Sequence, residues 1–406
     1  MTPSNTPLRL SVTTAHDDKS ISLQTPTSGS TLTPPVTPIA KELSDAERSI
    51  PSPVEEKALE QTTVQVKRNI STPLRFTDEV EICRDDEDRP VEFGRGAWSI
   101  VYKARSTLNN TTTPLHTPPS SPVTVSRVVA VKAPLRRDAR KVLQAEALTL
   151  TRLNLTPGFE KHVVPFQGFL SDSDALVMSA VPLALSTYIE DHADLRKKQH
   201  STATTFDPVQ GPESWRDMAR KLITGLAWLH DTAGIIHGDI KPHNVLLRRI
   251  STDEPGVDAG AFPYEPLLAD FSSAFNIPTD TTLTTPDTNQ ASMSAFTPPF
   301  TAPELLSLAS LKSGDVAPTP SSDVFSLAAT LIAAATGDLL LYPGSNNMQR
   351  LAMAREGHRI LEFTRAGSNG CRVPRNGFVE KLVQPAVSKD PAQRILTRDW
   401  MALASL

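Results

Sequence analysis

Cysteine, aromatic residues and long hydrophobic runs are all scarce in this chain of 406 residues. Two cysteines, Cys83 and Cys371, cannot build a disulfide framework, and they cannot form a zinc site without other ligands. No apolar run reaches the roughly 20 residues of a membrane span, and the N-terminus lacks the charged-then-apolar layout of a signal peptide. These absences predict a soluble protein of a reducing intracellular compartment, cytoplasmic or nuclear, with no membrane partner.

An excess of positive charge is also absent, because the net charge is -4 at pH 7. Binding to nucleic acid or to an anionic surface requires a basic face, so no nucleic-acid partner is expected. The hydrophobic content of 39% suffices for a sizeable core, provided that the polar residues are segregated. Nothing in the composition indicates the oligomeric state.

Proline, serine and threonine are indeed concentrated in a few stretches. Residues 1–75 are predicted to be disordered, because such a composition buries too little apolar surface to offset its conformational entropy. A globular domain is predicted over 76–406, interrupted by low-complexity insertions near 107–122, 193–212 and 249–263. The tail carries Thr-Pro or Ser-Pro pairs that indicate either targets of proline-directed kinases or incidental pairs in a solvated segment: Thr2, Thr6, Thr25, Thr33, Thr37, Ser52 and Thr72.

The most informative stretch runs from His237 to Asn244, with the sequence His-Gly-Asp-Ile-Lys-Pro-His-Asn. Asp239 can accept a hydroxyl proton, Lys241 can neutralise a phosphate, and Asn244 can bind a metal ion. Phosphoryl transfer needs these parts because it depends mostly on positioning and charge stabilisation. Eight residues alone do not establish such a site.

Upstream, a second group of residues is suited to binding phosphate. Gly94 and Gly96 precede a β-branched run that includes Val101, and glycines let a backbone approach phosphates closely; a plain hairpin turn is the alternative. Lys132 ends a strand-like run from Val128, where it is either a cleft residue or merely solvated.

Apolar residues at helical spacing predict a helix over 139–153 that includes Glu146 beside its apolar face. A glutamate in that position needs a buried cation, unless it lies at the surface. Two strands are predicted at 163–170 and 175–181, followed by an amphipathic helix over 215–230.

Beyond the central stretch, Asp270 follows a short apolar strand and precedes Phe271 and Ser272. Residues 296–304 read Phe-Thr-Pro-Pro-Phe-Thr-Ala-Pro-Glu, and an apolar helix is predicted from Ser322 to Ala335.

Taken in this order, the motifs resemble those of the eukaryotic protein kinase superfamily, Ser/Thr type. The resemblance covers residues 76 to 406 and implies an α+β, two-lobed fold: a small β-rich N-lobe over about 76–181 and a larger helical C-lobe over about 182–406, with ATP in the cleft.

The resemblance also implies a role for each matching residue. The implied catalytic residues are Asp239 as the base, Lys241 and Asn244, with Lys132 paired to Glu146. The implied magnesium ligands are Asn244 and Asp270. The implied nucleotide-binding residues are Gly94, Gly96, Val101, Ala130, Lys132, Met178, Ala180, Leu246 and Asp270. The implied partners are Mg-ATP and protein substrates with Ser or Thr hydroxyls. Structural roles are implied for Asp323, which ties down the loop at Asp239, and for Arg394, which pairs with Glu304.

Three positions depart from the family pattern: Ser99 and Ser272 replace glycines, and Gly238 replaces the arginine of the His-Arg-Asp motif. A phosphorylated activation loop normally pairs with that arginine, so we predict activity that does not depend on loop phosphorylation through this residue. The departures also leave open a nucleotide-binding pseudokinase scaffold. A small-molecule phosphotransferase is disfavoured by Ala302-Pro303-Glu304 and by the segment around Thr297.

Overall fold

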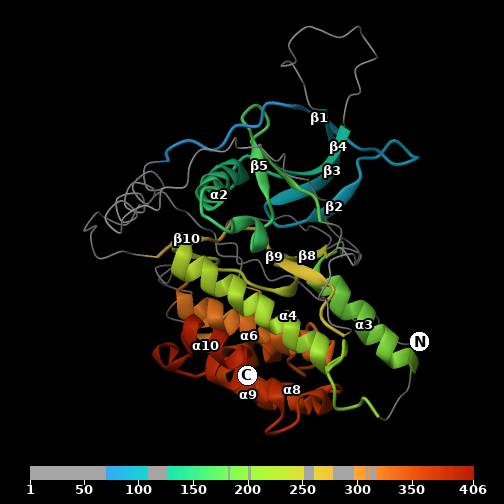
Figure 1. Ribbon diagram of the computed structural model, residues 1–406, viewed down its shortest axis with the longest axis vertical. Helices are drawn as coiled ribbons and strands as arrows, with labels where there is room; N and C mark the ends of the chain where they lie inside the picture. Colours follow the sequence, from blue (N-terminus) through green and yellow to red (C-terminus); the bar gives the residue numbers. More distant parts are fainter. Residues whose placement is uncertain are drawn as a thin grey trace, which may run out of the picture. The chain divides into compact units, whose positions relative to one another are not determined.

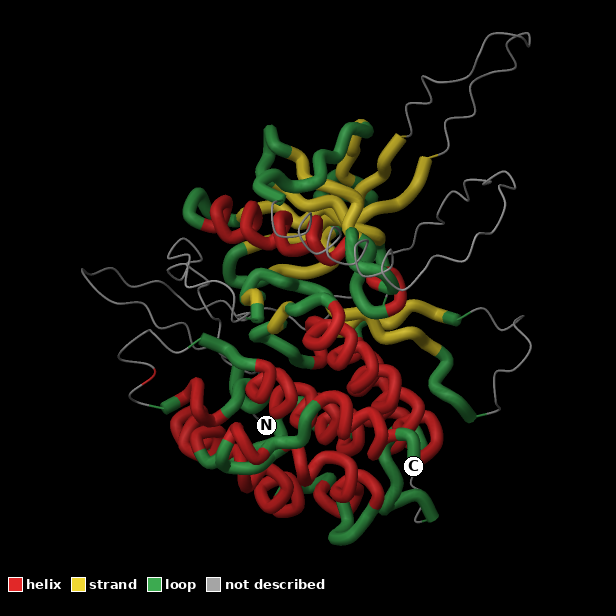
Figure 2. Tube along the Cα trace, turned by 60° about the vertical axis from the view of Figure 1, so that its left-hand side comes forward, coloured by secondary structure: helices red, strands yellow, loops and turns green. Residues whose placement is uncertain are grey.

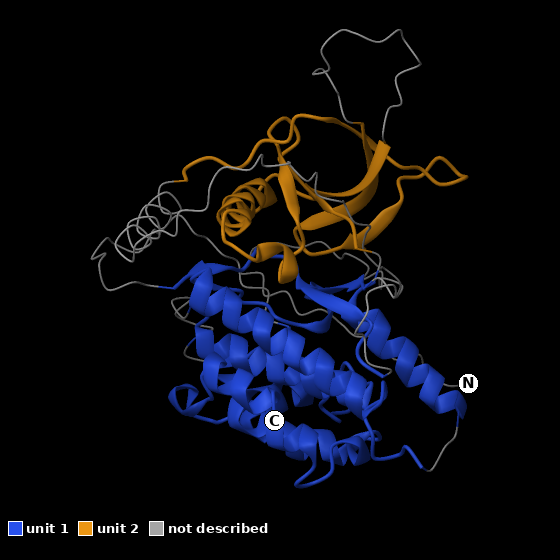
Figure 3. Ribbon diagram, in the orientation of Figure 1, with its two compact units in different colours: residues 1–31, 183–406 blue, residues 32–182 orange. Residues whose placement is uncertain are grey.

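The computed structural model describes residues 70–107, 126–181, 183–199, 203–250, 260–277, 297–307, 310 and 317–406. These residues fall into two compact units, one within 70–181 and the other within 183–406 (Figure 3). Most of the predicted tail, and most of the insertions predicted at 107–122 and 249–263, lie outside the described residues. So do the activation-loop threonines between residues 278 and 296.

The first unit is built on an antiparallel sheet with the strand order β1-β3-β4-β6-β5, in which β2 also pairs with β3. Its strands are β1 (Glu79–Ile82), β2 (Glu92–Arg95), β3 (Ser99–Thr107), β4 (Ser126–Pro134), β5 (Phe166–Leu170) and β6 (Ala175–Ser179). Residues of a strand point alternately to the two faces of a sheet. Val129 and Val131 on β4 therefore join a core with Ala104 and Val177, while Ala130 and Lys132 face the other side.

Helix α2 (Ala139–Asn154) packs alongside this sheet (Figures 1 and 2). Leu143, Ala147, Leu150 and Leu153 are buried at helical spacing, which gives the helix one apolar face. The helix predicted over 139–153 is therefore confirmed, and Glu146 is buried beside that face, only 1% exposed.

The second unit is mainly helical. Its helices are α3 (Leu185–Gln199), α4 (Pro212–Ala227), α6 (Pro320–Thr336), α7 (Asn347–Arg355), α8 (Ile360–Ala366), α9 (Phe378–Val383) and α10 (Thr397–Ala404). Helix α6 is buried along almost its whole length, and a capping box between Thr319 and Ser322 fixes its start. An antiparallel sheet followed by a helical region confirms the predicted fold class.

Short strand pairs in the second unit carry the loops of interest. Strands β8 (Val245–Arg249) and β9 (Tyr264–Leu268) are antiparallel neighbours, as are β7 (Ile235–Ile236) and β10 (Phe275–Asn276). The stretch from His237 to Asn244 lies between β7 and β8, so both of its ends are held by strand pairing.

Some boundaries differ from those expected. Residues 193–199 belong to helix α3 and not to a turn-rich insertion, because a polar, highly charged sequence such as 194–199 can form the outer end of a helix. Residues 70–75, which precede the expected boundary at 76, are described as part of the first unit. Within the described ranges, no helix is both long and apolar enough to cross a membrane.

Candidate active site

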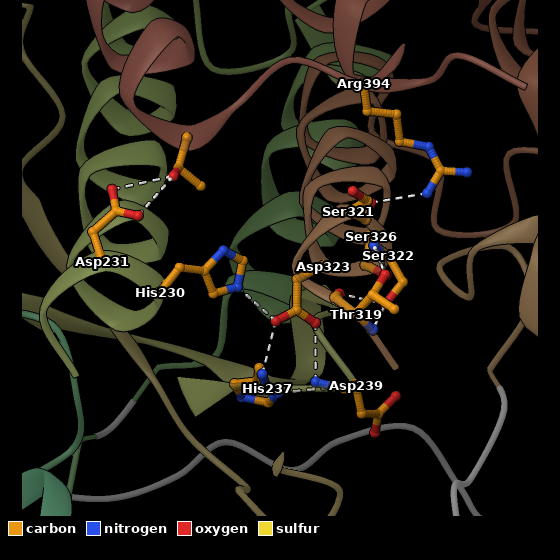
Figure 4. A network of polar contacts seen from close by, with 12 residues as sticks. His230, Asp231, His237, Asp239, Thr319, Ser321, Ser322, Asp323, Ser326 and Arg394 are labelled. Carbon is orange, nitrogen blue, oxygen red and sulfur yellow. Dashed lines mark hydrogen bonds and ion pairs between the residues drawn. The ribbon is translucent and has the colours of Figure 1, made fainter. Parts of the chain in front are cut away.

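A single buried carboxylate holds the loop that contains Asp239. The side chain of Asp323, on α6, accepts hydrogen bonds from the backbone N–H of His237 at 2.7 Å and of Gly238 at 2.9 Å (Figure 4). Its Oδ2 also lies 3.0 Å from Nε2 of His230. The role predicted for Asp323 is confirmed: one buried acid satisfies two backbone donors that would otherwise be costly to bury.

Asp239 is surrounded by hydrogen-bond donors. The ammonium group of Lys241 lies 2.5 Å from Oδ2 of Asp239 and also donates to the Thr297 hydroxyl at 3.1 Å. The side-chain amide of Asn244 donates to the same Oδ2 at 3.1 Å and to the backbone carbonyl of Asp239 at 2.9 Å. Lys241 thus lies beside Thr297, and the structure joins the three polar residues of the loop in one network.

Burial raises the pKa of the Asp239 carboxyl above its ordinary value. The ammonium of Lys241 opposes this effect, and the neighbouring charge of Asp270 adds to it. The side chain of Asp239 is 12% exposed, so a hydroxyl could still reach it. A base with a raised pKa binds a proton more strongly than a free aspartate does.

The β8–β9 pair brings Asn244 and Asp270 to the same place. Asn244 precedes β8 and Asp270 follows β9, and in an antiparallel pair these positions lie at one end; Ala269 N–H donates to the Asn244 carbonyl at 2.9 Å. The His237 ring packs on Phe271 with ring centroids 4.7 Å apart. His237 therefore packs against the segment that follows Asp270.

Ser272 makes a contact that the sequence did not predict. Its hydroxyl donates to Oδ1 of Asp270 at 2.7 Å. The residue with a left-handed backbone in this segment is Asp270, at φ 63°. Ser272 thus holds the carboxylate that precedes it, and the departure from Gly does not strain position 272.

Gly238 has no room for a side chain. Its φ is 78°, and a Cβ atom built there would lie 2.3 Å from the carbonyl oxygen of Ser273. Non-glycine residues rarely adopt this backbone conformation, and a backbone carbonyl cannot move away as the end of a flexible side chain could. The conformation of this loop therefore requires glycine at position 238. The sequence alone does not show this requirement.

In the first unit, Lys132 and Glu146 form a buried ion pair. Nζ of Lys132 lies 2.6 Å from Oε2 and 2.8 Å from Oε1 of Glu146, and their side chains are 5% and 0% exposed. The alternatives of a solvated lysine and a surface glutamate are excluded. The pair joins strand β4 to helix α2.

The register of the sheet brings most of the other predicted residues of this unit to one face. Gly94 on β2 pairs with Val101 on β3, Val101 with Lys132 on β4, and Ala130 with Met178 on β6. Cross-strand partners point to the same face, so Val101, Ala130, Lys132 and Met178 share it.

Gly96 closes the β2–β3 hairpin by donating its N–H to the Ser99 carbonyl at 2.7 Å, and Ala180 lies buried just beyond β6. The glycine stretch therefore forms the turn of the β2–β3 hairpin. Leu246 belongs to the second unit, in β8.

Arg394 and Glu304 form the predicted structural pair. The guanidinium donates to both carboxylate oxygens, at 2.8 and 2.7 Å, and also to the Ser321 carbonyl at 2.8 Å. This bidentate pair ties the segment after Ala302 to the start of α6 and to the last part of the chain.

Asn244 and Asp270 supply oxygen donors of the type that magnesium prefers. Elsewhere in the described parts of the chain, no group of three or more His, Cys, Asp or Glu side chains could hold a metal ion. The donor set therefore fits magnesium held by an amide and a carboxylate together with substrate phosphates, and it does not fit a site made by protein ligands alone.

Comparison with known proteins agrees with this geometry. The model of the family described as "Protein kinase domain" matches residues 90–403. A serine/threonine-protein kinase PknK of Mycobacterium tuberculosis is 30% identical over 263 residues, which are 63% of this chain and 18% of that protein. The serine/threonine-protein kinase ISR1 of Saccharomyces cerevisiae is 28% identical over 248 residues, 59% of this chain and 48% of that protein. The chain thus spans less than half the length of these relatives. The match over most of its own length shows that the chain belongs to the protein kinase domain family.

Proposed function

We propose that this protein is an ATP-dependent protein kinase that transfers the γ-phosphoryl group of Mg-ATP to Ser or Thr hydroxyls of protein substrates. The observation that carries this proposal is the network of Asp239, Lys241, Asn244 and Thr297, in which a carboxylate, an ammonium and an amide converge within 3.1 Å contacts. The relatives named above are both called serine/threonine-protein kinases, which supports the choice of acceptor hydroxyl.

In the proposed reaction, the substrate hydroxyl oxygen attacks the γ-phosphorus while its proton passes to the Asp239 carboxylate. The bond between the γ-phosphorus and the β,γ-bridging oxygen breaks, and ADP leaves with that oxygen. Lys241 stabilises the negative charge on the transferring group. Magnesium, when bound at Asn244 and Asp270, would neutralise the charge of the phosphates.

The residues of the first unit are assigned to the nucleotide. Lys132, oriented by Glu146, would pair with the α- and β-phosphates, and the backbone of the hairpin at Gly94 and Gly96 would cover the phosphates. Val101, Ala130, Met178 and Ala180 would contact the adenine. The buried Lys132–Glu146 pair supports this assignment because a paired lysine keeps its charge in dry surroundings.

The second candidate is a pseudokinase scaffold that binds nucleotide without turnover. Ser99, Ser272 and Gly238, the departures from the family pattern, favour it. However, the contacts of Ser272 with Asp270 and of Gly238 with Asp323 leave in place every group that the proposed reaction uses. Proline-directed kinases remain proposed partners for the N-terminal pairs. Of these pairs, Thr72-Pro73 lies among the described residues, with Thr72 exposed.

The deciding experiment incubates the purified chain with Mg-ATP and a generic protein substrate, beside Asp239→Asn and Asp270→Ala. We expect Asp239→Asn to lower kcat by about 10² to 10⁴-fold, the usual contribution of a general base, while a fluorescent ATP analogue still binds. Equal background transfer in all three proteins would rule out the kinase and leave the scaffold. Phosphoamino acid analysis of the product then tests the Ser/Thr preference.

A further inference from the structure

Residues 71–76, which we call the strap, lie before the part of the chain that matches the kinase family model, since that match begins at residue 90. The strap runs along β5, the edge strand of the first unit's sheet. Phe76 N–H donates to the Phe169 carbonyl at 3.0 Å, and Phe169 N–H donates to the Leu74 carbonyl at 2.7 Å. Arg75 and Phe169 form a parallel bridge. The strap thereby provides hydrogen-bond partners for backbone groups at the edge of the sheet.

A glycine on β5 makes room for this contact. Gly168 has φ 149°, and a Cβ atom built there would lie 2.7 Å from the backbone nitrogen of Phe76 and 2.9 Å from the carbonyl carbon of Arg75. Any side chain at position 168 would therefore displace the strap. This is a close approach of two backbones, for which glycine is the suitable residue.

The strap also contacts helix α2. Leu74 N–H donates to the Thr151 hydroxyl at 2.9 Å, and that hydroxyl donates in turn to the Ala147 carbonyl at 2.7 Å, one turn earlier in the helix. Ala147 is the neighbour of Glu146, the partner of Lys132. Two consecutive hydrogen bonds therefore link the strap to the turn of the helix that also carries Glu146.

The two ends of the strap are held differently. Phe76 is buried in the core with Val129 and Val177, only 7% exposed. The other end borders a hollow of about 500 Å³ whose lining includes Thr72, Pro73, Gln144 and Leu148. The hollow lies between the first strap residues and α2, and Leu74 makes the hydrogen bond to Thr151 of the helix.

We propose that the strap positions helix α2, with Thr151 and Gly168 as the residues through which it holds Glu146 in reach of Lys132. Only the expected effect on catalysis rests on the proposed function. The positioning itself concerns contacts within the first unit.

The test uses the full chain with Gly168→Ala, which displaces the strap, and Thr151→Val, which removes the hydroxyl and keeps the shape. Thr151→Ser restores the hydroxyl, and Thr149→Val is the matched control, since Thr149 lies on the same helix and is also buried. Amide hydrogen exchange of residues 143–150 should speed up about fivefold in Thr151→Val, as expected for one lost hydrogen bond. It should speed up more in Gly168→Ala, and it should be unchanged in Thr151→Ser and Thr149→Val.

In the active enzyme, the KM for ATP should rise about fivefold in Thr151→Val, while the KM for the protein substrate stays constant. The inference is overturned if exchange of 143–150 is unchanged in both disruptive variants, or if Thr149→Val alters exchange as much as Thr151→Val does. A wild-type chain without phosphotransfer, but with the expected exchange pattern, would remove the proposed function and leave the strap's role in place. Phosphotransfer by the wild-type chain, with exchange of residues 143–150 unchanged in both disruptive variants, would support the proposed function and overturn the strap's role.

Discussion

Each of the two units contains a lysine–carboxylate pair among its candidate site residues, and these two pairs are held in different ways. Lys132 and Glu146 are 14 residues apart, on a strand and a helix, and their side chains are 5% and 0% exposed. Lys241 and Asp239 are two residues apart in one loop, with side chains 10% and 12% exposed. The first pair depends on the packing of α2 against the sheet. The second depends on a loop conformation that Asp323 fixes through backbone amides.

The largest expected effect on unfolding free energy comes from replacing the lysine of each pair. Lys132→Met leaves the Glu146 carboxylate in dry surroundings without its ammonium partner, and removing one member of a buried pair costs about 3 to 5 kcal/mol. Lys241→Met should cost less, about 2 kcal/mol, because Asp239 keeps the Asn244 amide as a donor. Denaturant titration of both variants measures the difference. Equal losses would show that burial does not distinguish the two pairs.

A second prediction tests whether backbone conformation holds the loop of the second pair. Gly238→Ala forces a Cβ atom against the Ser273 carbonyl and should cost on the order of 3 kcal/mol in unfolding free energy. Gly234→Ala is the control, because Gly234 has a similar φ of 68° and nothing within 4 Å of its Cβ position. It should cost only about 1 kcal/mol, the penalty of the left-handed backbone. If both variants lose the same stability, close approach does not restrict position 238.

A third prediction concerns Ser272, which supports the carboxylate next to the second pair. Ser272→Ala removes the hydroxyl that donates to Asp270, and we expect kcat/KM to fall about fivefold, as for one hydrogen bond to a charged group. The magnesium concentration for half-maximal activity should rise in parallel. Ser272→Gly, which restores the family's residue, should behave like Ser272→Ala if the hydroxyl is what matters. An unchanged magnesium dependence in both variants would show that this contact does not orient Asp270.

The smallest expected effect is a pH dependence of the unfolding free energy that arises from Asp239, in the second pair. Burial raises the pKa of Asp239 in the folded protein, so the folded state binds its proton more tightly than the unfolded state does. The Asp239 carboxyl contributes its full stabilisation below its pKa in the unfolded chain, about 3.9. This stabilisation is lost as the pH rises through the raised pKa of the folded state. Without nucleotide or magnesium, Asp239→Asn should flatten this slope, as measured by urea denaturation from acid to neutral pH. The same slope in the variant would mean that Asp239 is not its source.

Motifs that depend on local sequence could be predicted. The helix around Glu146, the strand that contains Lys132 and the loop from His237 to Asn244 were expected from spacing and residue type, and each is present. The strand, however, runs two residues past Lys132, to Pro134. The contacts of Ser272, Gly168 and Thr151 were not foreseen. Each of these residues acts on a neighbour brought near by the fold, and a serine, a glycine or a threonine alone has too many ordinary uses to indicate such a contact.

The sequence by itself determined the family, the order of the elements and the identity of the polar groups, because these follow from motifs and from the spacing of apolar residues. Only the tertiary structure decided which groups are buried, why position 238 must be glycine, and that residues 71–76 belong to the first unit. These features arise where segments distant in the chain, such as 74 and 151 or 237 and 323, come within hydrogen-bonding distance. Distances of that kind are set by the packing of the whole unit and are not encoded in any local pattern.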